Sequence, residues 1–134
     1  MNIVFGVFIV LHGLVHMLYF GQSARFFELA PGMVWPDGSW AFSKLLSLGA
    51  NRILASILLV LAAVGFVAGG VGILASQSWS RSVIVGSAIF SSLLFILLWD
   101  GVAQRLDNKG AIGILINAAI LAALLLFHWP NFKF

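Results

Sequence analysis

Residues 11–19 read LHGLVHMLY, in the middle of the first hydrophobic span, Ile3–Phe20. Within that span the strongly polar side chains are those of His12 and His16. Side chains four residues apart lie on the same face of a helix, and Tyr19 continues their stripe. An ionisable group at membrane depth is costly, so it usually faces the bundle interior and has a partner there. The spacing therefore predicts a helix whose polar stripe faces inward and marks a functional place.

The composition of the whole chain is that of a membrane protein. Of its 134 residues, 62% are hydrophobic and 8% are charged, and the mean hydropathy is +1.11. A soluble domain has about 25% charged residues, and a membrane-spanning helix needs about 20 apolar residues. We therefore predict an all-α fold, an integral membrane four-helix bundle that forms one domain over residues 1–134. The predicted spans are Ile3–Phe20, Ile53–Ala75, Val83–Trp99 and Ala111–Trp129.

The same composition excludes several classes of function. The chain has no cysteine, which excludes disulfides, thiolate metal sites and thiol redox chemistry. The net charge of +3 comes from few residues, without a cluster of Lys and Arg that could follow a phosphate backbone, so we expect no nucleic-acid partner. The N-terminus lacks a basic segment and a small-residue cleavage site, which predicts that the first span is retained and not removed as a signal peptide.

The long connection Gly21–Arg52 should contain elements of its own, because structureless loops of that length are uncommon in compact domains. Ser39 is a suitable N-cap for a short amphipathic helix, Trp40–Leu48. With Trp35 and Trp40 beside it, this helix is predicted to lie in the lipid head-group region with its aromatic rings at the interface. The alternative is that it folds over the mouth of the bundle as a lid.

Small residues predict where the helices approach one another closely. Gly6 and Gly13, seven residues apart, form a shallow strip on the first span. Gly65 and Gly69 have the small-xxx-small spacing, which indicates packing rather than dimerisation. The third span carries hydroxyls that can bond to the preceding turn or across to a neighbouring helix. These hydroxyls belong to Ser87, Ser91 and Ser92.

Charge asymmetry predicts the orientation in the membrane. Four spans place both termini on one side and the two longer connections on the other. The positive-inside rule then puts these connections in the cytoplasm and both termini outside the cell's inner (plasma) membrane. The connections carry Arg25, Lys44, Arg52, Arg105 and Lys109, whereas the terminal side carries Arg81 and Lys133.

Depth brings the polar residues of different spans to a similar level. At 1.5 Å per residue, His16 lies about 6 Å and His12 about 12 Å below Phe20. Asn117 lies about 10 Å below the same surface, and the first and fourth spans can be neighbours in an up-down bundle. Asp100 is at the rim. The predicted ligand-binding pocket therefore consists of His12, His16, Tyr19, Asn117 and Asp100.

Two motifs resemble a group of small, uncharacterised bacterial four-span proteins. The first is the H-G-x-x-H element His12-Gly13-Leu14-Val15-His16. The second is Gly113-Ile114-Leu115-Ile116-Asn117, which follows a loop containing Trp and Asp. The resemblance implies a four-helix fold and no particular activity, and it leaves Asp107 as an alternative to Asp100 for the acid. The topology alone is also similar to that of DoxX-type proteins.

A metal ion and a haem are the cofactors to consider, and the cofactor itself stays unknown. His12 and His16, at positions i and i+4, can hold a metal ion from one helix, although a closed site needs further ligands and Asn is a poor one. The pair lacks the intervening glutamate of a zinc peptidase. His128 lies at the opposite end of the bundle, which argues against a bis-histidine haem.

Three functional hypotheses stay open. In the first, the pocket binds a lipid-like small molecule or a metal, with or without catalysis, since imidazole can transfer protons near neutral pH. In the second, the chain is a non-catalytic small subunit or assembly partner of a larger membrane complex, and its polar residues join its helices. In the third, it is a homo-oligomeric transporter, although it shows no charged ring and no internal repeat.

Overall fold

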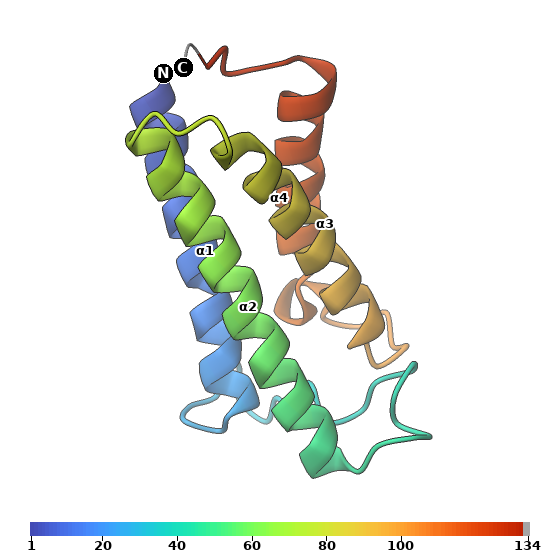
Figure 1. Ribbon diagram of the computed structural model, residues 1–134. Helices are drawn as coiled ribbons and strands as arrows, with labels where there is room; N and C mark the ends of the chain where they lie inside the picture. Colours follow the sequence, from blue (N-terminus) through green and yellow to red (C-terminus); the bar gives the residue numbers. More distant parts are fainter. Residues whose placement is uncertain (133–134) are drawn as a thin grey trace.

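The computed structural model describes residues 1–132, and over these residues the protein is helical, with no strand (Figure 1). This confirms the predicted all-α class. Helices α1 and α2 lie side by side, and α1 begins at the end of the molecule where α4 finishes (Figure 1). The elements are α1 (Asn2–Ser23), α2 (Leu48–Leu74), α3 (Ser80–Leu97), the 3₁₀ turn η1 (Leu106–Lys109), α4 (Ala111–Leu121) and its π-helical continuation η2 (Ala122–Leu126).

Three helices are long and apolar enough to cross a membrane: α1 with 22 residues, α2 with 27 and α3 with 18. The fourth apolar helix, Ala111–Leu126, is shorter. It measures about 24 Å at 1.5 Å per residue, against about 30 Å of hydrocarbon. It ends before the predicted limit of Trp129, because the turn at η2 is followed by His128 with a positive φ of 50°.

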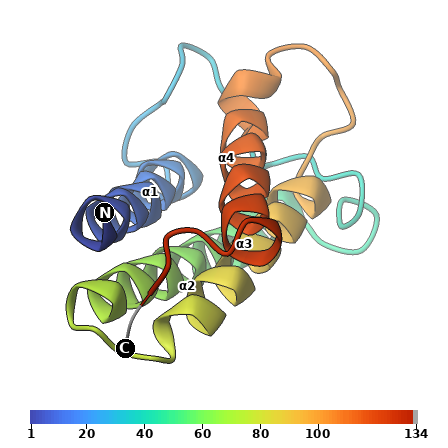
Figure 2. The ribbon, with the colours of Figure 1, turned by 90° about the horizontal axis from the view of Figure 1, so that it is seen from above.

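The helices pack in chain order, α1 on α2, α2 on α3 and α3 on α4. Seen from above, the ribbons of α1 and α4 stand apart (Figure 2), and we call the boundary between these two helices the seam. The hydrophobic core lies between the helices and contains large side chains from all four of them. Its most deeply buried members include Ile9, Phe66, Ile84 and Leu124.

The predicted strip of Gly6 and Gly13 is where α1 touches α2. A Cβ added at Gly13 would lie 2.8 Å from the Cβ of Phe66 and 3.1 Å from a backbone oxygen of α2. A Cβ at Gly70 of α2 would lie 2.8 Å from the backbone oxygen of Gly6. Real Cβ atoms do not come this close, so the two backbones approach each other only because these positions lack side chains.

The predicted helix Trp40–Leu48 is wrong, because residues 40–45 form successive turns and Leu48 is already the first residue of α2. Ser39 does accept the backbone N–H of Phe42, at 3.2 Å, as an N-cap would. The backbone N–H of Trp40, however, donates to the carbonyl of Trp99 at 2.8 Å. This tie to the end of α3 fixes the segment as turns, and Ser47 takes the role of N-cap by accepting from the N–H of Ala50 at 3.1 Å.

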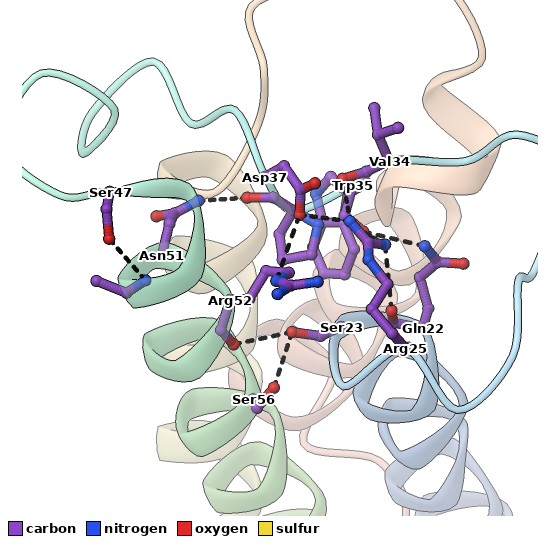
Figure 3. Close-up of polar contacts among 12 residues, drawn as sticks. Gln22, Ser23, Arg25, Val34, Trp35, Asp37, Ser47, Asn51, Arg52 and Ser56 are labelled. Carbon is purple, nitrogen blue, oxygen red and sulfur yellow. Dashed lines mark hydrogen bonds and ion pairs between the residues drawn. The ribbon is translucent and has the colours of Figure 1, made fainter.

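Residues 24–47, which we call the cap, fold over the end of the bundle (Figure 3). The fully buried Gln22 at the end of α1 donates to the carbonyls of Met33 at 3.0 Å and Trp35 at 3.1 Å. Arg25 forms an ion pair with Asp37 and donates to the backbone of the cap. Trp35, predicted to be an interfacial ring, is buried within the protein, whereas Trp40 is 55% exposed.

Candidate functional site

The two histidines of α1 face the bundle interior, and His12 is joined directly to α4. Its Nε2 lies 2.8 Å from Oδ1 of Asn117. Both side chains are buried, with exposures of 5% and 0%. His12 thus meets the fourth helix at the level of Asn117, as its depth predicts, whereas the other members of the stripe meet different partners. This hydrogen bond links α1 to α4.

His16 joins α1 to α3. Its Nδ1 lies 3.1 Å from the carbonyl oxygen of His12, one turn earlier on the same helix. Its Nε2 lies 2.7 Å from Oγ of Ser91. The side chain is 2% exposed. Both ring nitrogens of His16 are therefore engaged within the chain.

Asn117 closes the network between α4 and α3. Its Nδ2 donates to Oγ of Ser91 at 3.0 Å and to Oγ of Ser92 at 3.2 Å. Ser92 in turn donates to the carbonyl of Ala88 at 2.8 Å. The side chains of His12, Asn117, Ser91 and His16, with the carbonyl of His12, thus form a closed cycle, which we call the polar ring.

A single pattern of donors satisfies every bond of the polar ring when both imidazoles are neutral. Nε2–H of His12 donates to Asn117, and the amide group of Asn117 donates to Ser91. The hydroxyl of Ser91 donates to Nε2 of His16, whose Nδ1–H donates to the carbonyl of His12. Such a cycle meets the requirement that polar groups in an apolar interior have partners.

Phe66 of α2 packs on the polar ring, so all four helices contribute to the site. Its ring centroid lies 4.8 Å from that of His12, edge to face, and 5.3 Å from that of His16. Phe66 could not be assigned to the site from the sequence, because an apolar ring in an apolar helix is indistinguishable from its neighbours. Ser91 was recognised as a residue able to bond across helices but was not assigned to the site, since Ser87 and Ser92 carry the same signal.

Tyr19 continues the histidine stripe but does not join the polar ring. The ring of Phe95 lies between them, with centroid distances of 5.0 Å to Tyr19 and 5.8 Å to His16. The hydroxyl of Tyr19 instead donates to the carbonyl of Asp107 at 3.4 Å. Trp35 of the cap packs on the same pair of rings. Tyr19 therefore belongs to the aromatic packing beneath the cap.

Neither candidate acid reaches the polar ring. Asp100 forms an ion pair with Lys109 at 2.8 Å and accepts the N–H of Val102 at 3.0 Å, at the surface. Asp107 is exposed in the same connection. The structure therefore brings together His12, His16 and Asn117, and leaves both carboxylates and Tyr19 outside. The spacing of loop residues could not reveal this, because the path of a connection is set by its tertiary contacts.

The polar ring offers few free donor atoms for a metal ion. Both nitrogens of His16 and Nε2 of His12 are already hydrogen-bonded. Within residues 1–132, no group of three His, Cys, Asp or Glu side chains could hold a metal. His128 lies near the start of α3, where its Nδ1 is 2.9 Å from Nη2 of Arg81. A metal at His12 and His16 would have to break the polar ring and would lack a third protein ligand of these types.

An apolar cleft of about 410 Å³ lies between α1 and α4 and opens from the seam. None of the polar-ring residues lines the cleft, but two of them lie behind its wall. Phe8, which lines the cleft, stacks on His12 with ring centroids 6.2 Å apart. On α4, two lining residues, Ile116 and Ile120, are the near neighbours of Asn117 in sequence. The lining consists of Met1, Val4, Phe5, Phe8, Ile116, Ala119, Ile120, Ala123 and Trp129.

Chemically, this arrangement combines a closed, buried hydrogen-bond network with an apolar cleft that lies next to it. The cleft offers an apolar surface of a size suited to an apolar molecule. The resemblance of the H-G-x-x-H element to small four-span proteins stays a prediction. No protein-family model, curated protein or solved structure matches the chain.

Proposed function

We propose that the chain binds an elongated, lipid-like apolar molecule in the cleft between α1 and α4. The observation that carries this proposal is the cleft itself, which is lined almost entirely by apolar atoms and has in its wall Phe8, the ring that stacks on His12. Its volume of about 410 Å³ lies in the range of about 300–1,000 Å³ that is usual for ligand sites. A bilayer would fill such a seam with hydrocarbon in any case, so an apolar occupant has no water to displace.

The polar ring would give the site its selectivity. The His12–Asn117 hydrogen bond lies behind the lining residues Phe8 and Ile116, so the polar end of an occupant would reach this pair by displacing one of these side chains. Polar groups at membrane depth commonly mark substrate sites. We assign binding and not catalysis, because no carboxylate or further ionisable side chain within residues 1–132 joins the two imidazoles.

The proposed setting is a plasma membrane crossed four times, with α4 as the fourth span. The cap and the connection before α4 would then face the cytoplasm and both termini the outside. The cations support this orientation: Arg25, Lys44, Arg52, Arg105 and Lys109 belong to the first group, and Arg81 to the second. Lys133, which is also predicted to lie on the side of the termini, is outside the described residues.

A second candidate is a non-catalytic subunit of a larger membrane complex, and the closure of the polar ring favours it. Every bond of the ring is made within the chain, as expected where polar residues hold helices together. In this case the cleft would receive an apolar helix of a partner protein instead of a small molecule.

Filling the cleft distinguishes the candidates. Ala119 lines the cleft, whereas its neighbour Ala118 is exposed on α4 but does not line it. We expect Ala119→Phe to remove the lipid-like molecule that co-purifies with the protein in mild detergent, as detected by native mass spectrometry and solvent extraction. The matched variant Ala118→Phe should retain it.

Equal occupancy in the two variants would contradict binding in the cleft. If Ala119→Phe instead releases a co-purifying protein and leaves the bound small molecules unchanged, the subunit proposal is supported and the ligand proposal is overturned.

A further inference from the structure

A second pocket, of about 310 Å³, lies at the other end of the molecule between the cap and the connection from α3 to α4. We propose that this pocket, which we call the head-group pocket, binds a phosphate-bearing head group. This goes beyond the cleft between α1 and α4, because the lining residues and the chemistry differ. The polar atoms of its lining come from Trp35, Asp100, Gln104, Arg105, Asn108 and Lys109.

Trp35 provides a buried donor without a partner. The side chain lines the pocket and is 4% exposed, yet its Nε1 has no hydrogen-bond partner within residues 1–132. An indole N–H can only donate, and an acceptor such as a phosphate oxygen would satisfy it. Because Nε1 is itself buried, a ligand in the pocket would reach it once the neighbouring side chains move aside.

Arg105 provides an uncommitted positive charge at the same pocket. Its guanidinium makes no hydrogen bond or ion pair with any residue in the range 1–132, in contrast to the ammonium group of Lys109, which is held by Asp100 and by the carbonyl of Val102 at 3.1 Å. The backbone of Arg105 is left-handed, with a φ of 54°. A guanidinium presents several N–H donors in one plane, which matches the oxygens of a phosphate.

The charges of the lining select a ligand with one negative charge. Arg105 and Lys109 are cationic and Asp100 is anionic, so the lining carries a net charge of +1. Because Lys109 already neutralises Asp100, the charge of Arg105 is left for the ligand. A phosphodiester, as in a phospholipid, carries a single negative charge.

The rim of the pocket suits a lipid. The lining residues Val34 and Val102 expose 67% and 47% of their surface. Apolar side chains at this level would lie against the upper part of the acyl chains while the phosphate occupies the pocket. Soluble inorganic phosphate would use the same donors but would gain nothing from this apolar rim, which provides a way to distinguish the two sources.

The test measures binding to the full chain in nanodiscs or mild detergent. Native mass spectrometry would compare retention of phosphatidylglycerol and phosphatidylcholine, and a competition series would add inorganic phosphate. We expect Arg105→Gln to weaken phosphatidylglycerol binding by about tenfold, the loss of a charge-assisted hydrogen bond. Trp35→Phe keeps an aromatic ring against Tyr19 and Phe95 and should weaken binding by roughly threefold.

Lys44→Gln is the matched control, because it removes an exposed cation from the cap that does not line the pocket. An equal loss in Lys44→Gln and Arg105→Gln would overturn the proposal in favour of general attraction between charges. Displacement of the lipid by millimolar phosphate would support the phosphate site with a soluble source, and resistance to it would support the lipid source. If the wild type retains neither phosphatidylglycerol nor phosphate at a higher level than Arg105→Gln does, the proposed site is overturned.

Discussion

Asn117 is the residue on which the interior depends most. A carboxamide has both an acceptor and two N–H donors, and here the acceptor faces α1 while the donors face α3. No apolar side chain, and no carboxylate or hydroxyl alone, can make these bonds with neutral partners. The residue therefore determines which faces of α1, α3 and α4 meet.

We predict that Asn117→Leu lowers the free energy of unfolding by about 1–3 kcal/mol, since it leaves the buried Nε2–H of His12 without an acceptor and Oγ of Ser91 without the N–H that it accepts. Interhelical hydrogen bonds in membranes average about 0.6 kcal/mol, so most of the effect would come from the stranded polar groups. Unfolding in mixed micelles of rising dodecyl sulfate content, followed by circular dichroism, measures it.

Ser92→Ala is the control for that measurement, because it removes one acceptor of Asn117 while Ser91 keeps the other. Its effect should stay below about 1 kcal/mol. If both variants unfold at the same detergent composition as the wild type, the polar ring contributes nothing to the stability of the bundle.

At this scale the sequence predicted what helical periodicity determines. His12 and His16 are four residues apart in an apolar helix, and the rise per residue puts Asn117 at their depth. Asp100 and Tyr19 could not be placed in the same way. Asp100 lies in a connection whose path follows its ion pair with Lys109, and the side chain of Phe95 separates Tyr19 from His16.

The contact between α1 and α2 is the closest helix pairing, and it holds the histidine face in position. Gly13 lies between His12 and the turn that carries His16, against Phe66 of α2. A backbone contact at this point lets Phe66 pack on both imidazoles. The glycine strip and the histidine stripe are thus two faces of one helix that act together.

Gly13→Ala should lower the free energy of unfolding by about 1–3 kcal/mol, the usual effect of overpacking. The added Cβ would come within 2.8 Å of the Cβ of Phe66, which belongs to a fixed part of the helix and cannot rotate away. The same titration with dodecyl sulfate measures the change.

Gly113→Ala on α4 is the matched substitution, because a Cβ at this position meets nothing within 4 Å. Alanine is the better helix former by about 1 kcal/mol, so this variant should be as stable as the wild type or more stable. If Gly113→Ala is destabilised and Gly13→Ala is as stable as the wild type, the assignment of the close helix contact to Gly13 is wrong.

Elements were predicted well where local periodicity decides and less well where distant contacts do. The capping signal of Ser39 is real, yet the N–H of Trp40 bonds to Trp99 and no helix follows. The end of α4 is also held by Arg81 of α3, 43 positions earlier in the chain. Its guanidinium donates to the carbonyl of Leu124 within η2. No pattern within residues 111–129 carries that information.

On the scale of the whole molecule, the two ends differ in construction. One end is closed by the cap, which is pinned to α1 by Gln22 and to the last turn of α3 by Trp40. Towards the other end, the α1/α4 seam opens into the apolar cleft. In the proposed membrane setting, a molecule of this shape would admit an apolar ligand through the seam, while the cap would cover the other end of the bundle.

The charges on the two ends predict how the molecule lies in a membrane. The chain has no cysteine, so single cysteines introduced at exposed positions report their side without background. We expect a membrane-impermeant maleimide to label Ser78→Cys and Asn131→Cys in intact cells, and Lys44→Cys and Asp107→Cys only after the membrane is opened. The reason is that the cations concentrate on the side of the cap, which the positive-inside rule keeps in the cytoplasm. Asp107 and Asn131 flank the short helix α4, so labelling of both positions from the same side would show that α4 does not cross the membrane. Labelling of Lys44→Cys in intact cells would show that the molecule has the reverse orientation.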